Sequence, residues 1–167
     1  MTLPADPTSH PGEHKVLGVR WDVQEDQLVF DLRSLAERAT DLQPTKRNVV
    51  SLIGQIYDPL GYLSPVTVAF KILMQEVCKV KVAWDQPLAG ELLSKWEFLI
   101  GALKEGVQFR IPRHYLNRLH TDPTNKMQLF GFRDASNAAY TAVVYIVESS
   151  DDRNAPSFVV CKTRVSL

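Results

Sequence analysis

The clearest indication of the fold comes from a stretch near the end of the chain, Gln128-Leu129-Phe130-Gly131-Phe132-Arg133-Asp134-Ala135-Ser136, followed by Tyr140-Thr141-Ala142-Val143-Val144-Tyr145-Ile146-Val147. Both parts are rich in β-branched and aromatic residues, which predicts two strands. Asn137 and its small neighbours favour a turn between them. The pattern places Asp134 at the mouth of a β-hairpin. A carboxylate there either simply ends a strand or faces a divalent ion such as Mg²⁺, which prefers oxygen ligands.

Length and composition limit the class of protein. A chain of 167 residues forms one domain or two small ones, and 45% hydrophobic with 23% charged residues is typical of globular proteins. Net charge is zero, so nucleic-acid binding would depend on local basic clusters. Cys78 and Cys161 form no C-x-x-C, and the histidines lack metal-ligand spacing. Without a signal peptide or a transmembrane run, we expect an intracellular protein, cytoplasmic or nuclear, with no membrane association.

The first part of the chain predicts a lead-in and a hairpin. Residues 1–14 contain three prolines and no apolar period, which predicts disorder. Lys15–Asp22 and Gln27–Asp31 predict two strands of a hairpin, with clear alternation only in the second. Gly18 indicates a bulge or the close approach of another molecule. Trp21 either stacks on a base or is a half-buried strand tryptophan.

A helix is predicted to begin after Thr45, which is a suitable N-cap. Lys46 and Arg47 fall in its first turn, where basic residues oppose the helix dipole. They face either a phosphate backbone or solvent. One face of this helix is apolar and consists of Val49, Leu52, Ile53 and Ile56.

A second helix follows directly. Asp58-Pro59-Leu60-Gly61 ends the first helix, and Ser64 and Pro65 predict an N-cap and a first helical position for a helix that runs to about Lys79. The two helices should form a hairpin that buries one shared face. We expect that core to contain Val49, Ile53, Ile56, Phe70 and Leu73.

The remaining segments are assigned by the same patterns. Ser34–Leu42 is polar and ambiguous, whereas Leu88–Lys104 predicts a third helix. Val107–Pro112 is extended, and its proline indicates a sheet edge. Residues 114–126 resemble a loop and mark the best domain boundary. Ser157–Lys162 predicts a third strand after a polar loop over residues 149–156.

These elements predict an α+β fold. It comprises a short β-hairpin, a helical hairpin with a third helix, and a three-stranded antiparallel sheet. The expected divisions are 1–14, 15–33, 34–82, 83–127 and 128–167.

Several segments, in this order, resemble the Pol polyprotein of BEL/Pao-type LTR retrotransposons, and the similarity extends over about residues 15–167. They are Thr45-Lys46-Arg47, Ile53-Gly54-Gln55-Ile56-Tyr57-Asp58-Pro59-Leu60-Gly61-Tyr62-Leu63-Ser64-Pro65-Val66, Trp84-Asp85, Arg110-Ile111-Pro112-Arg113, Gly131-Phe132-Arg133-Asp134-Ala135-Ser136, Ala139-Tyr140 and Lys162-Thr163-Arg164-Val165.

The resemblance implies a region that begins at the end of a reverse-transcriptase palm and enters ribonuclease H. Residues 15–33 would be the palm end with the primer grip, 34–82 a thumb-like unit, 83–127 a connection and 128–167 a truncated ribonuclease H-like sheet. The palm and the rest of ribonuclease H would be its missing partners. No Tyr-x-Asp-Asp is present, and later ribonuclease H carboxylates would follow Leu167. The chain alone should therefore be non-catalytic.

The resemblance also implies the site residues. Asp134 matches the first Mg²⁺-binding carboxylate of ribonuclease H. The expected ligand is a primer–template or an RNA–DNA hybrid, bound weakly and without sequence preference. The residues expected to contact it are Lys15, Leu17, Gly18, Trp21, Lys46 and Arg47.

Two other functions stay open. The family also carries a peptidase label, but retroviral-type aspartic peptidases use Asp-Thr/Ser-Gly, and Asp134-Ala135-Ser136 lacks the glycine. The third possibility is a domesticated interaction module without a nucleic-acid role, which is compatible with zero net charge.

Overall fold

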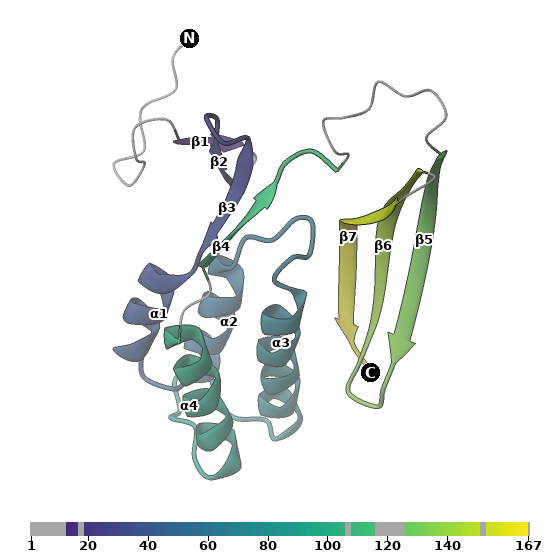
Figure 1. The fold of residues 1–167 in the computed structure, drawn as a ribbon. Coiled ribbons are helices and arrows are strands. Elements are labelled where there is room, and N and C mark those ends of the chain that lie inside the picture. The colour runs from purple at the N-terminus through teal and green to yellow at the C-terminus, as the bar shows by residue number, and fades with distance from the viewer. Residues whose placement is uncertain (1–12, 17–18, 106–107, 116–125, 151–152, 167) are drawn as a thin grey trace.

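The structure is a computed structural model that describes residues 13–16, 19–105, 108–115, 126–150 and 153–166. It has the predicted α+β architecture, with a four-stranded sheet, a helical unit and a three-stranded sheet (Figure 1). The elements in chain order are β1 (Glu13–Val16), β2 (Val19–Asp22), β3 (Gln27–Asp31), α1 (Arg33–Thr40), α2 (Lys46–Gln55), α3 (Ser64–Lys79), α4 (Glu91–Lys104), β4 (Gln108–Pro112), β5 (Lys126–Ala135), β6 (Ala139–Ser150) and β7 (Arg153–Val165).

The four-stranded sheet is antiparallel with strand order β1-β2-β3-β4. The prediction of one strand over Lys15–Asp22 was wrong, because β1 and β2 pair with each other and Val16 lies opposite Val19. Glu13 and His14, assigned to the disordered lead-in, belong to β1. Alternation in this stretch is only partial, so it could not distinguish one strand from two. The rest of the lead-in, residues 1–12, lies outside the described residues.

The predicted edge strand is confirmed in β4. Among the strands that the structure describes it pairs with β3 alone, and it occupies one edge of the sheet, with Pro112 opposite Gln27. Proline cannot donate a backbone hydrogen bond, so an edge is where the sheet accommodates it. β4 follows α4 in the chain yet joins the sheet of the first three strands, and it thus links the two ends of the helical unit.

Thr45 caps α2 as predicted, with its side chain accepting a hydrogen bond from Asn48 N at 3.3 Å. The predicted cap of α3 was wrong, because Ser64 is already helical and Leu63 occupies the N-cap position. Leu63 has no side-chain acceptor. The Asp58 carboxylate instead accepts hydrogen bonds from the preceding turn, from N–H groups of Gly61, Tyr62 and Leu63 at 2.9, 2.9 and 2.7 Å.

The ambiguous segment after β3 is a helix. α1 has a polar outer face, but Leu35, Ala36 and Ala39 are buried against the core. Three small or apolar residues in eight are a weak periodic signal, and tertiary packing therefore decides this helix.

The helical unit encloses the main core. Its members at the α2–α3 interface include Leu52 and Phe70, both with no exposed surface. Val49, Ile56 and Leu73 are buried as predicted. Ile53 is only half-buried and packs against the core from its margin, so the prediction that it is buried with the other four residues was wrong. Leu52 lies one position away on the same apolar stripe and takes that place.

The three-stranded sheet has order β5-β6-β7, with Asp134 opposite Thr141. The predicted polar loop was wrong for most of its length, since Ser149 pairs with Asn154 and Glu148 with Ala155. Backbone pairing with the long β6 satisfies the N–H and C=O groups whatever the polarity of the side chains.

This sheet packs closely against the helical unit beside α3 (Figure 1). Cys161 N of β7 donates to Leu60 O at 2.8 Å. Gly61 has φ +85°, and a Cβ there would lie 2.0 Å from Cys161 O. Glycine is thus required by both conformation and space. The Tyr62 ring packs on Phe158, with centroids 4.3 Å apart.

None of the helices in the described part of the chain is long and apolar enough to cross a lipid bilayer.

The core makes a stability prediction. Leu52→Ala should lower the free energy of unfolding by about 2–5 kcal/mol, because it leaves a cavity in a packed site. Ile53→Ala removes a half-buried side chain of similar size and should cost clearly less. Urea denaturation of both variants tests this ranking, and an equal or reversed order would contradict the core described above.

Candidate functional site

A cavity of about 460 Å³ lies between the start of α3 and the β5-β6-β7 sheet. Its walls are largely apolar and include Tyr62, Tyr145 and Phe158. Among its lining residues, all from the described part of the chain, Asp134 is the only acid. The cavity therefore presents one carboxylate beside aromatic surfaces.

Asp134 lies next to the end of β5, close to the position predicted from the sequence. It is exposed, and its Oδ1 accepts a hydrogen bond from Ala135 N at 2.9 Å. Within the described residues, no group of three or more His, Cys, Asp or Glu side chains could hold a metal ion. Two-metal hydrolysis needs several acidic ligands. These residues alone do not fit the Mg²⁺ pair of a ribonuclease H site.

A second candidate surface combines the first turn of α2 with the loop before α4. Lys46 Nζ lies 5.0 Å from the centroid of the Trp84 ring, and Arg47 Cζ lies 5.9 Å from it. Trp84 is 51% exposed. Such cation–π contacts contribute about 0.5–1 kcal/mol at exposed sites. We call Lys46, Arg47 and Trp84 the cation–tryptophan surface.

Asp85 partly neutralises this surface. Its Oδ1 and Oδ2 accept hydrogen bonds from Arg47 Nε and Nη2 at 2.6 and 3.0 Å. The hydrogen bond and the charge attraction raise the pKa of the Arg47 guanidinium and lower the pKa of the Asp85 carboxyl. Both side chains are well exposed, so solvent and salt screen the pair and it contributes little to stability.

Sequence reasoning identified Lys46 and Arg47 but assigned no binding role to Trp84. Trp84-Asp85 entered only as part of the family resemblance. Arg47 and Asp85 are 38 positions apart, so no local pattern could place them together. The available signal was positional, namely a tryptophan in the connection between two predicted helices that belongs to the apolar stripe of neither helix.

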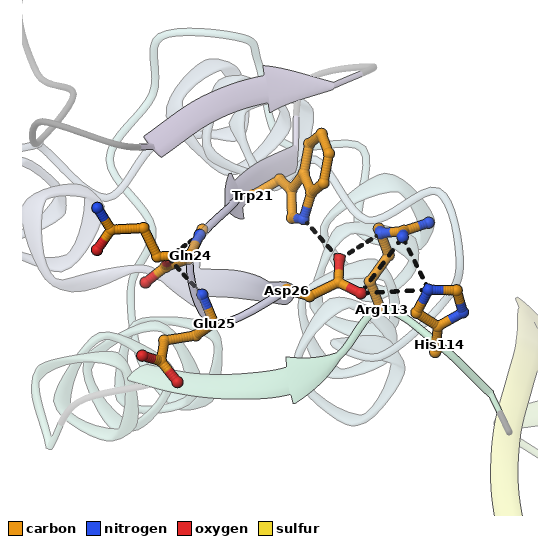
Figure 2. A network of polar contacts seen from close by, with 7 residues as sticks. Trp21, Gln24, Glu25, Asp26, Arg113 and His114 are labelled. Atoms are coloured by element: carbon orange, nitrogen blue, oxygen red, sulfur yellow. Dashed lines mark hydrogen bonds and ion pairs between the residues drawn. The ribbon is translucent and has the colours of Figure 1, made fainter. Parts of the chain in front are cut away.

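Trp21 is held in a separate network at the end of the four-stranded sheet (Figure 2). Its Nε1 donates to Asp26 Oδ1 at 3.0 Å, and Arg113 Cζ lies 5.2 Å from the ring centroid. Arg113 Nε also donates to Asp26 Oδ1, at 2.6 Å. Trp21 is half-buried and therefore has a structural role between the β2–β3 turn and β4. This agrees with its interpretation as a half-buried strand tryptophan.

Three further contacts lie in or beside this network. Arg110 of β4 pairs with Asp22 at 2.6 Å. His114 Nε2 lies 3.0 Å from Arg113 Nη2 and 3.3 Å from Asp26 Oδ2 (Figure 2). It can accept from the arginine when unprotonated or donate to the carboxylate when protonated. The hydrogen bond from Arg113 is the main factor that lowers the pKa of Asp26.

The remaining residues predicted to contact nucleic acid are only partly described. Lys15 lies in β1 with its backbone opposite Arg20, and its side chain lies outside the description. Leu17 and Gly18 lie outside the described residues. α1 runs away from the four-stranded sheet. α2 therefore begins at the end of the helical unit that lies farthest from β2 (Figure 1). The structure thus separates Trp21 from Lys46 and Arg47.

A sequence model of one protein family, described as the Pao retrotransposon-like RNaseH-like domain, matches residues 45–167. The chain belongs to this family. A search of curated proteins found no match. The matched region includes the Pao helical hairpin, the cation–tryptophan surface and the sheet that carries Asp134. The recognised resemblance to a BEL/Pao Pol region is thereby confirmed.

The family description names a ribonuclease H-like domain and no peptidase. The Pao chain also contains no Asp-Thr/Ser-Gly triplet. Aspartic peptidases need two carboxylates that share a proton. The described residues that line the cavity at Asp134 contribute one carboxylate.

The Asp26 network predicts an acid dependence of stability. The folded state lowers the pKa of Asp26 below its ordinary value of 3.8, so its contribution is complete above that pH. The contribution is lost as pH falls through the lowered value. Asp26→Asn should lower the unfolding midpoint at pH 7 and reduce the further loss between pH 5 and about pH 2.

Asp41→Asn is the matched control. Asp41 is exposed, and no basic side chain of the described residues forms an ion pair with it. Urea denaturation across this pH range should show a reduced acid response only for Asp26→Asn. Equal responses in the two variants would contradict the assigned role of Asp26.

The single acid at the cavity makes a catalytic prediction. We expect this chain to leave an RNA–DNA hybrid uncut in Mg²⁺, with no change in Asp134→Asn, because one carboxylate cannot hold two Mg²⁺ ions. Gel analysis of a labelled hybrid measures this, with an active ribonuclease H as the positive control. Cleavage that disappears in Asp134→Asn would show that acids outside the described residues complete the site.

Proposed function

We propose that this Pao-family chain binds the sugar–phosphate backbone of a primer–template or RNA–DNA hybrid without reading its sequence. In this proposal residues 34–82 act as a thumb-like unit of a reverse transcriptase/ribonuclease H polyprotein. Lys46 and Arg47 make the contacts. The observation that carries the proposal is the uncompensated charge of Lys46 on the cation–tryptophan surface.

Lys46 supplies the net positive charge of this surface. No carboxylate of the described residues forms an ion pair with its ammonium group. Its contact with the Trp84 ring is weak, so the group can turn to a phosphate oxygen at little cost. Lysine binds phosphate as a point charge and needs no fixed orientation, which suits binding without base readout.

Arg47 can contribute in a second way. Its ion pair with Asp85 is solvent-exposed, with 62% of the arginine side chain and 72% of the aspartate side chain accessible. Exposed pairs are weak and screened by salt. A phosphate that approaches Lys46 can therefore compete with Asp85 for the guanidinium, and an arginine fork fits two phosphate oxygens.

The proposal assigns binding to this chain and does not assign hydrolysis. Asp134 would be the one carboxylate that these residues contribute to a ribonuclease H-like site, and Mg²⁺ would bind only where further acids join it. A domesticated interaction module is the competing function. That alternative predicts no affinity for nucleic acid, so a binding measurement separates the two.

The test is a double substitution, Lys46→Ala with Arg47→Ala. Fluorescence anisotropy with a labelled RNA–DNA hybrid should show weak binding by the parent chain that falls steeply with salt, because phosphate contacts release counterions. The variant should bind more weakly at low salt. Its slope of log affinity against log salt should be smaller by about 1–2, because each phosphate that is no longer neutralised reduces the slope by roughly one.

Lys104→Ala is a single-charge control, because it removes a positive charge from the exposed end of α4, away from the proposed contacts. It should leave most of the affinity and slope intact. Affinity that is independent of salt, or equal losses in the control and the double variant, would overturn the proposal. Absence of binding by the parent chain would favour the interaction module.

A further inference from the structure

We propose that Trp84 is a stacking platform for an unpaired base, so that the cation–tryptophan surface binds single-stranded nucleic acid in preference to uninterrupted duplex. This inference rests on the proposed function and narrows its ligand. The ligand class is a single-stranded segment, such as the unpaired template beside a primer end. The base would stack on the indole while the adjacent phosphate contacts Lys46.

The three tryptophans of the chain have different surroundings, and only Trp84 suits this role. Trp96 is 4% exposed and belongs to the helical core. Trp21 is half-buried, with Nε1 bonded to Asp26 and Arg113 over its ring. Trp84 is 51% exposed and lies outside the core cluster. An exposed indole presents a π-face that any base can stack on, whatever its identity.

The loop around Trp84 is anchored on α2. Arg47 N donates to Trp84 O at 3.0 Å, and Leu88 N donates to Pro44 O at 2.7 Å. Leu88 is 3% exposed and packs into the core. The indole is thus presented by a backbone that is already ordered, and a rigid aromatic loses little conformational freedom on binding.

The position of Lys46 over the indole determines which kind of nucleic acid fits this surface. Lys46 lies over the indole in the free chain, and a base that takes its place releases the ammonium group toward the neighbouring phosphate. In duplex nucleic acid the base faces are already stacked on one another, so only the phosphate contact is available. Unpaired bases supply both contacts, which gives the surface its preference.

The experiment compares Trp84→Ala and Trp84→Phe with the parent chain on three labelled probes. The probes are an oligothymidylate, an abasic phosphodiester of the same length and a long duplex whose ends are a negligible fraction of its sites. Circular dichroism first checks that the variants are folded. Trp84→Ala should weaken oligothymidylate binding about 5- to 150-fold, as expected when one base–aromatic stack is removed.

The other probes and the second variant supply the controls. Abasic and duplex binding should change less than twofold in Trp84→Ala, and Trp84→Phe should retain most of the oligothymidylate affinity because phenylalanine keeps a stacking face. Oligothymidylate should also quench tryptophan emission in the parent chain, and this quenching should be absent in Trp84→Phe despite its binding.

The outcomes distinguish this inference from the proposed function. Loss of affinity for all three probes in Lys46→Ala with Arg47→Ala, but no probe-selective loss in Trp84→Ala, would overturn the stacking role and leave backbone binding in place. Equal weakening on oligothymidylate and abasic probes would do the same. No binding of any probe by the parent chain would overturn both.

Discussion

The arrangement of the molecule depends on one carboxylate, that of Asp58, which accepts three backbone hydrogen bonds from the turn before α3. These bonds fix a turn in which the N-cap residue has no side-chain acceptor, and they place Gly61 where its lack of a side chain allows Cys161 O to approach. The same turn offers Leu60 O to the β7 backbone and the Tyr62 ring to Phe158. This single turn thus connects α2 to α3 and also provides the contacts that attach the β5-β6-β7 sheet.

That junction also determines what Asp134 can do. Docking of the sheet on α3 creates the cavity, and the β5–β6 register directs Asp134 toward it. The carboxylate there has aromatic and hydroxyl neighbours but no second acid among the described residues that line the cavity. Asp134 is therefore accessible at a cavity, while the described residues around it lack the further acids that two-metal hydrolysis needs. The position of Asp134 in the fold does not by itself make a complete catalytic site.

Charged and aromatic side chains are paired in two places, with different consequences. At the sheet end, Asp26 holds both Trp21 and Arg113, so the tryptophan stabilises the packing of β4. At the start of α2, Asp85 holds Arg47, and Trp84 keeps half of its surface open. The two tryptophans look alike in a sequence, since each adjoins an aspartate at the next position. The side chains around each indole make the difference. Asp26 holds Trp21 in the packed end of the sheet, whereas Trp84 stays half-exposed beside Lys46 and Arg47 and is available to a ligand.

Local sequence patterns were enough to establish the α+β class, the Thr45 cap, the edge position of β4 and the resemblance to the Pao family. The structural features among these follow from apolar periodicity, capping and proline chemistry, which act within a few residues. The tertiary structure decided the rest: Lys15–Asp22 divides into two strands, Leu52 rather than Ile53 is fully buried, Asp58 binds the turn where Ser64 was expected to cap, and Trp84 lies beside Lys46 and Arg47. The two strands and the Asp58 turn are short-range arrangements that compete with alternatives of similar local propensity. The other two features depend on a contact between remote parts of the chain or on a choice between equally apolar neighbours. Local propensity carries no information about either, because packing energy is defined only once the partner surface is present.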